Sequence, residues 1–290
     1  MDRLQMKIRK IKNPVVLDMT VSKEQLPPHL LKEEGTYLRA YGKFCIELME
    51  ALQGELCAVR YSYGLFSLLG TDGLAWLSKI CDHAKNLGYY VFLDLPDVKT
   101  TTQSSMFAQL VFDQMFPVYF DGLIVTSYIG TDGYAGYLPF LNDMEKDLFI
   151  VLRSSNKSAA QLQDLMTGGR LVHTAIADEL VRSRKGAVGK CGYSNLGGVA
   201  ASAAPASLQN LRSKYKELFL IVDSCDASHP NTKNCALGFD AFGHGAILCV
   251  GTYITCAWKT EMLDGSAFAI CAKEAAAKLK GNISRYISIL

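Results

Sequence analysis

The sequence predicts an α/β fold, a single (β/α)8 barrel of the TIM type that spans residues 1–290 as one domain. Short apolar runs recur at intervals that leave room for a helix between them. The runs are apolar nearly throughout, as expected for parallel strands that are buried on both faces. No proline-rich or low-complexity linker interrupts the alternation, which favours one closed barrel over two domains.

Eight runs are the predicted strands. In chain order they cover residues 14–18, 56–61, 89–95, 122–127, 147–154, 186–192, 217–223 and 245–251. An open doubly wound sheet is the structural alternative, but no Gly-x-Gly-x-x-Gly motif opens any of the helices.

The segments between the runs have helical periodicity. Residues 74–88 place their apolar side chains on one helical face, and Gly88 stands where a helix usually stops. Residues 158–184 open with a serine that can cap a helix, but the segment is long for one helix. We expect Gly168 and Gly169 to divide it in two.

Composition narrows the function classes. A hydrophobic content of 49% supplies a large core, and a formal net charge of +2 lacks the basic signature of nucleic-acid binding. The nine cysteines include no Cys-x-x-Cys pair and no zinc-spaced Cys/His cluster, so we expect buried thiols and no metal. The basic first residues lack the apolar centre of a secretory signal, and no run is long enough to span a membrane. We therefore expect a soluble, cytoplasmic protein.

Polar residues close most of the predicted strands, where the site of a parallel barrel lies. They are Asp18, Arg60, Asp94, Thr126, Ser154, Ser155, Lys190, Asp223 and Thr252. Any one of them could simply be a helix cap or a turn residue. Asp18, Arg60 and Asp94 follow adjacent strands, and three ionisable groups in one small volume suggest a site.

Several segments resemble the orotidine 5′-phosphate decarboxylases in their longer bacterial form. They are the opening "MDRLQMKIRKIKNPVVLDMT", "YIGTDGYAGYLPFL" (128–141), "VLRSSNKSAAQLQDL" (151–165) and "GFDAFGHGAILCVGTYITCAWK" (238–259). The resemblance covers nearly the whole chain. It implies a homodimer and decarboxylation of orotidine monophosphate without any cofactor.

The resemblance also implies residue roles. Asp18 matches the aspartate that holds the ribose, and Ser155 matches the serine that touches the pyrimidine. Arg60 stands where the family has a lysine. Asp94 matches the first aspartate of the family's Asp-x-Lys-x-x-Asp motif.

The departures from the family fall on the chemistry. The motif's lysine, which donates a proton to the carbanion left by carbon dioxide, falls on Pro96, and its second aspartate falls on Lys99. Proline carries no titratable group and no backbone N–H. The family's phosphate-binding arginine falls on Thr252, and residues 223–234 contain no glycine, although Gly251 could keep a weak phosphate contact through the backbone.

Two compensations are conceivable for the missing proton donor. Pro96 could reshape the turn so that Lys99, with Asp97, serves as the acid, but the sequence favours the interpretation of both as solvated charges before a helix. Lys190 could instead act as a Schiff-base lysine in an aldolase-type reaction.

The sequence thus favours a diverged decarboxylase-like barrel that binds a nucleotide-like or sugar-like ligand, or a protein partner, without the family's chemistry. The alternative is a working orotidine 5′-phosphate decarboxylase with Lys99 as proton donor. The lesser alternative is the Lys190 aldolase. The expected catalytic residues are Asp94, Asp97 and Lys99, and the expected binding residues are Asp18, Arg60, Ser155, Gly251 and Thr252.

Overall fold

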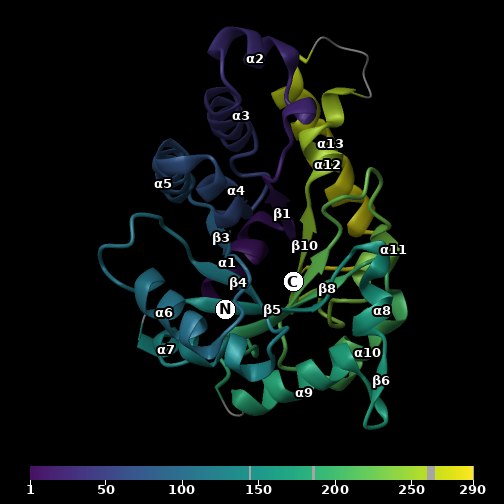
Figure 1. Cartoon of the computed structure of the whole chain (residues 1–290). Coiled ribbons are helices and arrows are strands. Elements are labelled where there is room, and N and C mark those ends of the chain that lie inside the picture. The colour runs from purple at the N-terminus through teal and green to yellow at the C-terminus, as the bar shows by residue number, and fades with distance from the viewer. Residues whose placement is uncertain (144, 185–186, 260–264, 290) are drawn as a thin grey trace.

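A closed barrel of eight parallel strands forms the centre of the computed structural model, which describes residues 1–143, 145–184, 187–259 and 265–289 (Figure 1). The barrel strands are β1 (Val15–Asp18), β2 (Ala58–Ser62), β3 (Tyr90–Asp94), β4 (Gly122–Thr126), β5 (Asp147–Arg153), β8 (Leu196–Ala201), β9 (Leu220–Asp223) and β10 (Ala246–Val250). They follow one another around the barrel in chain order, and pairing of β1 with both β2 and β10 closes it. The predicted (β/α)8 fold is confirmed.

Helices surround the strands. They are α1 (Asp2–Ile11), α2 (Pro28–Glu34), α3 (Tyr37–Ala51), α4 (Tyr63–Leu68), α5 (Gly70–Asn86), α6 (Thr101–Val111), α7 (Phe140–Asp143), α8 (Ala160–Gln163), α9 (Val172–Ser183), α10 (Pro205–Lys214), α11 (Thr232–Ala236), α12 (Thr252–Thr255) and α13 (Phe268–Ile283). Short 3-10 helices cover Lys23–Gln25, Gly130–Gly133, Ala135–Tyr137, Lys157–Ala159 and Ala257–Lys259. Within the described ranges, no helix has both the length and the apolar character needed to cross a membrane.

Aromatic side chains fill the barrel interior. Tyr90, Phe92, Phe149 and Phe219 pack in sequence, with ring centroids 4.8, 5.4 and 6.2 Å apart. Helix α1 adds Leu4 and Ile8 to the same cluster, so it covers the amino-terminal end of the barrel. That end is therefore a packed base, which leaves the carboxyl ends of the strands for a site.

Local sequence signals explain several element boundaries. Gly88 lies just beyond α5 with a φ of 88°, a backbone conformation that glycine adopts without strain. Thr100 caps α6, because its Oγ1 accepts a hydrogen bond of 3.1 Å from the backbone N–H of Gln103. The expected division of residues 158–184 is also found. Gly168 and Gly169 form the turn of a small hairpin, β6 (Met166–Thr167) and β7 (Arg170–Leu171), between α8 and α9.

The prediction of the sixth strand was wrong. Residues 187–192 of the expected run form a loop, Gly186 lies outside the described residues, and the sixth barrel strand is β8. Strand β8 reads Leu-Gly-Gly-Val-Ala-Ala, a small-residue run that resembles a loop. The small residues are required there, because a Cβ atom on Gly197 would lie 2.6 Å from the Phe149 ring.

Candidate active site

Three charged side chains gather at the carboxyl ends of the first three strands. Residue Asp18 of β1 lies in register with Arg60 of β2, and Ser62 of β2 lies in register with Asp94 of β3. The Arg60 guanidinium forms an ion pair with the Asp94 carboxylate, with side-chain exposures of 18% and 27%. Asp18 is buried beside them. The structure thus brings these three predicted site residues into one volume.

The carboxylates fix the charge of Arg60. Burial acts to lower the pKa of Arg60, but the negative charges of Asp18 and Asp94 outweigh it and hold that pKa well above its ordinary value. Burial raises the pKa of Asp94, and Arg60 only partly offsets this effect. Arg60 is therefore a permanent cation at the centre of this end of the barrel.

A local turn holds the Asp18 carboxylate in place. The backbone N–H and the hydroxyl of Thr20 donate hydrogen bonds of 3.2 and 2.9 Å to its Oδ1 atom. Such a turn fixes the carboxylate at the strand end, where it can accept hydrogen bonds from a ligand hydroxyl.

Ser155 faces a carboxylate that the sequence did not single out as a site residue. Its hydroxyl donates a hydrogen bond of 3.0 Å to Oδ2 of Asp223, the last residue of β9. The other oxygen of Asp223 accepts a hydrogen bond from the backbone N–H of Cys225. The position of Asp223 at the end of the seventh run was the available signal, although its pairing with Ser155 could not be read from the sequence.

Gly251 and Thr252 open the short helix α12 after β10. A Cβ atom at Gly251 would lie 3.0 Å from the Cys225 carbonyl, which favours glycine at this position. The backbone N–H groups of Gly251 and Thr252 both donate to that same carbonyl, over 3.3 and 3.0 Å. Thr252 also lines a cavity of about 670 Å³ together with His229 and Lys278. These backbone donors are thus already bonded within the protein.

Within the segment from Pro96 to Lys99, Asp97 and Lys99 lie in different surroundings. The Asp97 Oδ1 atom accepts a hydrogen bond of 3.0 Å from the hydroxyl of Thr126, at the end of β4. Lys99 is exposed before α6, where its backbone N–H donates to the side chain of Gln103. Among the described residues, Lys99 forms no ion pair. The structure therefore does not join Lys99 to Asp94.

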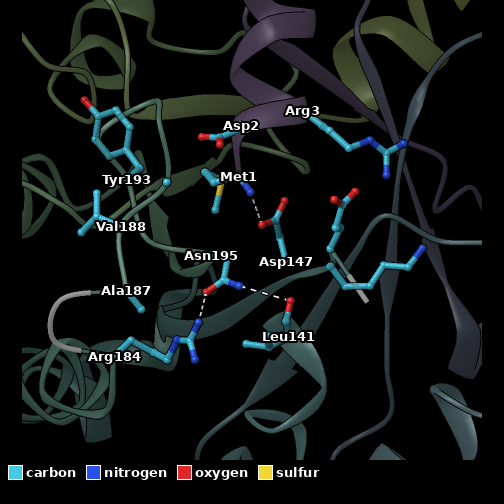
Figure 2. Close-up of a pocket in the computed structure, with 13 residues that line it drawn as sticks. Met1, Asp2, Arg3, Leu141, Asp147, Arg184, Ala187, Val188, Tyr193 and Asn195 are labelled. Carbon is cyan, nitrogen blue, oxygen red and sulfur yellow. Dashed lines mark hydrogen bonds and ion pairs between the residues drawn. The ribbon is translucent and has the colours of Figure 1, made fainter. Parts of the chain in front are cut away.

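Lys190 lies at the opposite end of the barrel, and its assignment as a strand-end lysine was wrong. Its backbone N–H donates to Asp2, the first residue of the helix that covers the base. A cavity of about 400 Å³ opens at this end, where the amino group of Met1 faces Asp147 (Figure 2). Lys190 therefore lies far from the strand ends at which the charged residues gather. No cluster of three metal-ligating side chains occurs in the described part of the chain.

No protein-family model matches the chain. Curated relatives named orotidine 5′-phosphate decarboxylase align with nearly all of it. The protein from Rhodopirellula baltica is 26% identical over 253 residues, which is 84% of each chain. The proteins from Clostridium novyi and Clostridium acetobutylicum are 22% and 24% identical over 285 residues, with 98% of each chain covered.

Solved structures give the same likeness. Leishmania donovani OMP decarboxylase has a TM-score of 0.72 at 19% identity, covering 97% of this chain and 98% of that one. The Plasmodium berghei orotidine 5′-monophosphate decarboxylase has a TM-score of 0.75 at 12% identity, with 98% and 99% covered. The structures support the fold, and the curated relatives confirm the resemblance predicted from the sequence motifs.

Proposed function

We propose that this chain, as one barrel domain of residues 1–290, binds orotidine 5′-phosphate at the carboxyl end of the barrel and removes its carboxylate as carbon dioxide. The observation that carries the proposal is the alignment, over 84–98% of the chain, with relatives that are named for this reaction. The partly buried charged group formed by Asp18, Arg60 and Asp94 supports it, because it lies where such a barrel holds its substrate.

The reaction requires a cation beside the developing negative charge and an acid that protonates the product. Arg60 fits the first role, because the carboxylates around it keep it charged. It does not fit the second, since a pKa held that high makes it a poor proton donor. We assign the proton to Lys99, an exposed lysine five positions beyond Asp94 that forms no ion pair within the described ranges. We expect its side chain to turn toward a bound ligand.

The remaining contacts divide the ligand between two sides of the barrel mouth. Asp18 is placed to accept from ribose hydroxyls, and the Ser155–Asp223 pair offers a hydroxyl and a carboxylate to the polar edge of the base. The phosphate is assigned to the cavity beside Thr252, where the described lining includes the cations of Lys259 and Lys278 and one carboxylate, that of Glu274. Gly251 shapes this region and does not donate to the phosphate.

A second candidate function is nucleotide binding without turnover. Pro96 favours it, because it stands where the resemblance places the proton-donating lysine. The ion pair between Arg60 and Asp94 also favours it, since the two charges already satisfy one another in the free protein. In this case the ligand is a product-like nucleotide such as uridine 5′-monophosphate.

An absorbance assay for loss of orotidine 5′-phosphate separates the two functions. Turnover by the natural chain that falls sharply in Lys99→Ala, and is kept in Lys10→Ala, supports the decarboxylase. Lys10 is a matched exposed lysine at the base of the barrel. No turnover, combined with thermal stabilisation by uridine 5′-monophosphate, supports the binding function. If neither turnover nor stabilisation is found, both functions are overturned.

The active form is proposed to be a cytoplasmic homodimer. Large apolar side chains are exposed on elements that follow β2, β3 and β4, which are neighbours in the barrel. They are Leu68, Met106, Leu110, Met115 and Tyr128. A second copy of the chain would bury them. The nine cysteines, eight of them buried, fit a reducing compartment.

A further inference from the structure

Two thiols meet at the mouth of the barrel, in contact with the central cation. Cys249 lies on β10, Cys225 lies just beyond β9, and their sulfur atoms are 3.2 Å apart. The Nη1 atom of Arg60 lies 3.5 Å from Cys225 Sγ and 3.8 Å from Cys249 Sγ. The two sulfur atoms and the Asp94 carboxylate therefore contact the same guanidinium. The proposed function assigns to this guanidinium the stabilisation of the developing negative charge.

We propose that Cys225 and Cys249 form an oxidisable pair, a modification site at which a peroxide converts the two thiols into an intrachain disulfide. This inference goes beyond the proposed function and does not depend on it, since it needs no nucleotide. Cys225 is the thiol that meets the oxidant first, because it is 8% exposed and Cys249 is fully buried.

The reaction balances in two steps. The Cys225 thiol attacks hydrogen peroxide, the O–O bond breaks, and sulfenic acid and one water are formed. The Cys249 thiol then attacks the sulfenic sulfur, the S–O bond breaks, and the hydroxyl leaves with the thiol proton as a second water. Both electrons come from the pair of thiols, and the peroxide is reduced to two molecules of water.

The geometry favours the second step over further oxidation of Cys225. A disulfide has a sulfur–sulfur distance of about 2.0 Å, so the two atoms need to approach by roughly 1 Å. Cys249 is in register with Asp223, two residues before Cys225, so the pair bridges adjacent strand ends. The Cys225 carbonyl is fixed by the N–H groups of Gly251 and Thr252, which holds the two chain segments together.

The surroundings of Cys225 also determine how fast we expect it to be oxidised. The hydrogen bond to Cys249 and burial both raise the pKa of Cys225, so little thiolate exists at neutral pH. The positive charge of Arg60 acts in the opposite direction. We therefore expect oxidation that is slower than that of an exposed thiol but specific in its product.

The test is peptide mapping of the full chain after treatment with hydrogen peroxide, with remaining thiols alkylated before digestion. We expect one linked peptide pair that joins Cys225 to Cys249, a loss of mass equal to two hydrogen atoms, and reversal by dithiothreitol. Cys225→Ala and Cys249→Ala should each abolish the linked pair. Cys256→Ala should keep it, because Cys256 has the same 8% exposure and its sulfur contacts the Thr255 hydroxyl at 3.8 Å.

Peptide mapping of the natural chain shows whether Cys225 and Cys249 form the disulfide, even if a variant fails to fold. Cys225 recovered as an unlinked sulfinic acid would overturn the proposal. The same holds if Cys225 is linked to a different cysteine, or if both thiols stay reduced while Cys256 is oxidised. These results are independent of any nucleotide assay, so failure of the proposed function leaves them unchanged.

Discussion

Arg60 on β2 pairs with Asp94 on β3, and the same guanidinium lies within 4 Å of the sulfurs of Cys249 on β10 and Cys225 just beyond β9. The cation therefore joins the two sides of the barrel mouth. Asp18 on β1 is the second carboxylate that acts on this cation. The guanidinium therefore offsets the repulsion between the carboxylates of Asp18 and Asp94. The contribution of this shared cation to stability can be measured.

Replacing Arg60 by methionine removes the charge and keeps most of the side-chain volume. We expect the free energy of unfolding to fall by about 2 kcal/mol, because Asp18 and Asp94 are then buried without a cation; partial exposure keeps this below the loss for a fully buried pair. Urea unfolding at pH 7 measures the loss. Arg60→Lys retains the charge and should lose less. Equal stability of the natural chain and Arg60→Met would contradict the stabilising role of this cation.

Moving the lysine tests the assignment of the proton donor. The double variant Pro96→Lys/Lys99→Asp rebuilds the Asp-x-Lys-x-x-Asp order after Asp94. If Lys99 is the acid, Lys99→Asp alone should lower kcat by about 100-fold, the usual contribution of a general acid. The double variant should recover that loss. The measurement is the rate of disappearance of orotidine 5′-phosphate at saturating substrate. A single variant with undiminished kcat would remove Lys99 from the mechanism.

The sequence indicated the barrel and the charged strand ends, because both depend on local patterns. A buried parallel strand is an apolar run, and the charged residues Asp18, Arg60 and Asp94 near the ends of such runs can be read directly from the sequence. The sixth strand failed this test, since its Gly197 is required by the Phe149 ring on the paired strand β5 and by the Phe219 carbonyl, neither of which is close to it in sequence. The same limit applies to the contact of Cys225 with Cys249 and to the pairing of Ser155 with Asp223. Both join separate strands, and no local pattern encodes them.

The packing at Gly197 predicts opposite effects of the same substitution at two glycines. Gly197→Ala should destabilise the protein by about 1–3 kcal/mol, because its Cβ would lie 2.6 Å from the Phe149 ring and 2.7 Å from the Phe219 carbonyl. Gly281→Ala, at an exposed position of α13 where a Cβ would have no neighbour within 4 Å outside its own helix backbone, should stabilise it by about 0.5–1 kcal/mol. Thermal unfolding of both variants provides the comparison. A stable Gly197→Ala protein would mean that the barrel interior can relax.

Asp240 at the base of the barrel should make stability depend on pH. Burial acts to raise its pKa, but hydrogen bonds from the Tyr193 hydroxyl and from the backbone N–H groups of His244 and Phe242 hold that pKa below its ordinary value. A carboxyl group with a lowered folded-state pKa stabilises above its unfolded pKa, and this stabilisation is lost as the pH falls through the folded pKa.

The variant Asp240→Asn isolates this contribution. It should be less stable than the natural chain at pH 7, by about 1 kcal/mol, because it loses charged hydrogen bonds. The difference should shrink as the pH falls below the ordinary pKa of an aspartate, where the unfolded carboxyl group is protonated, and should vanish as the pH falls through the lowered folded-state pKa. Urea titrations at several pH values measure this. A difference that stays constant with pH would show that the charge of Asp240 does not stabilise the fold.

Leu110 provides the test of the proposed dimer. It lies one helical turn from Met106 on α6, and the two side chains are 60% and 54% exposed. A charged side chain in a buried apolar contact leaves an unpaired charge, so Leu110→Glu should yield a monomer in sedimentation at low concentration. Leu162→Glu is the matched control, because Leu162 is a leucine of 45% exposure on α8, away from the elements after β2, β3 and β4. If Leu162→Glu dissociates the dimer and Leu110→Glu does not, the two copies meet through another face of the barrel. A natural chain that sediments as a monomer would remove the dimer altogether, and Lys99 would then have to act within its own barrel.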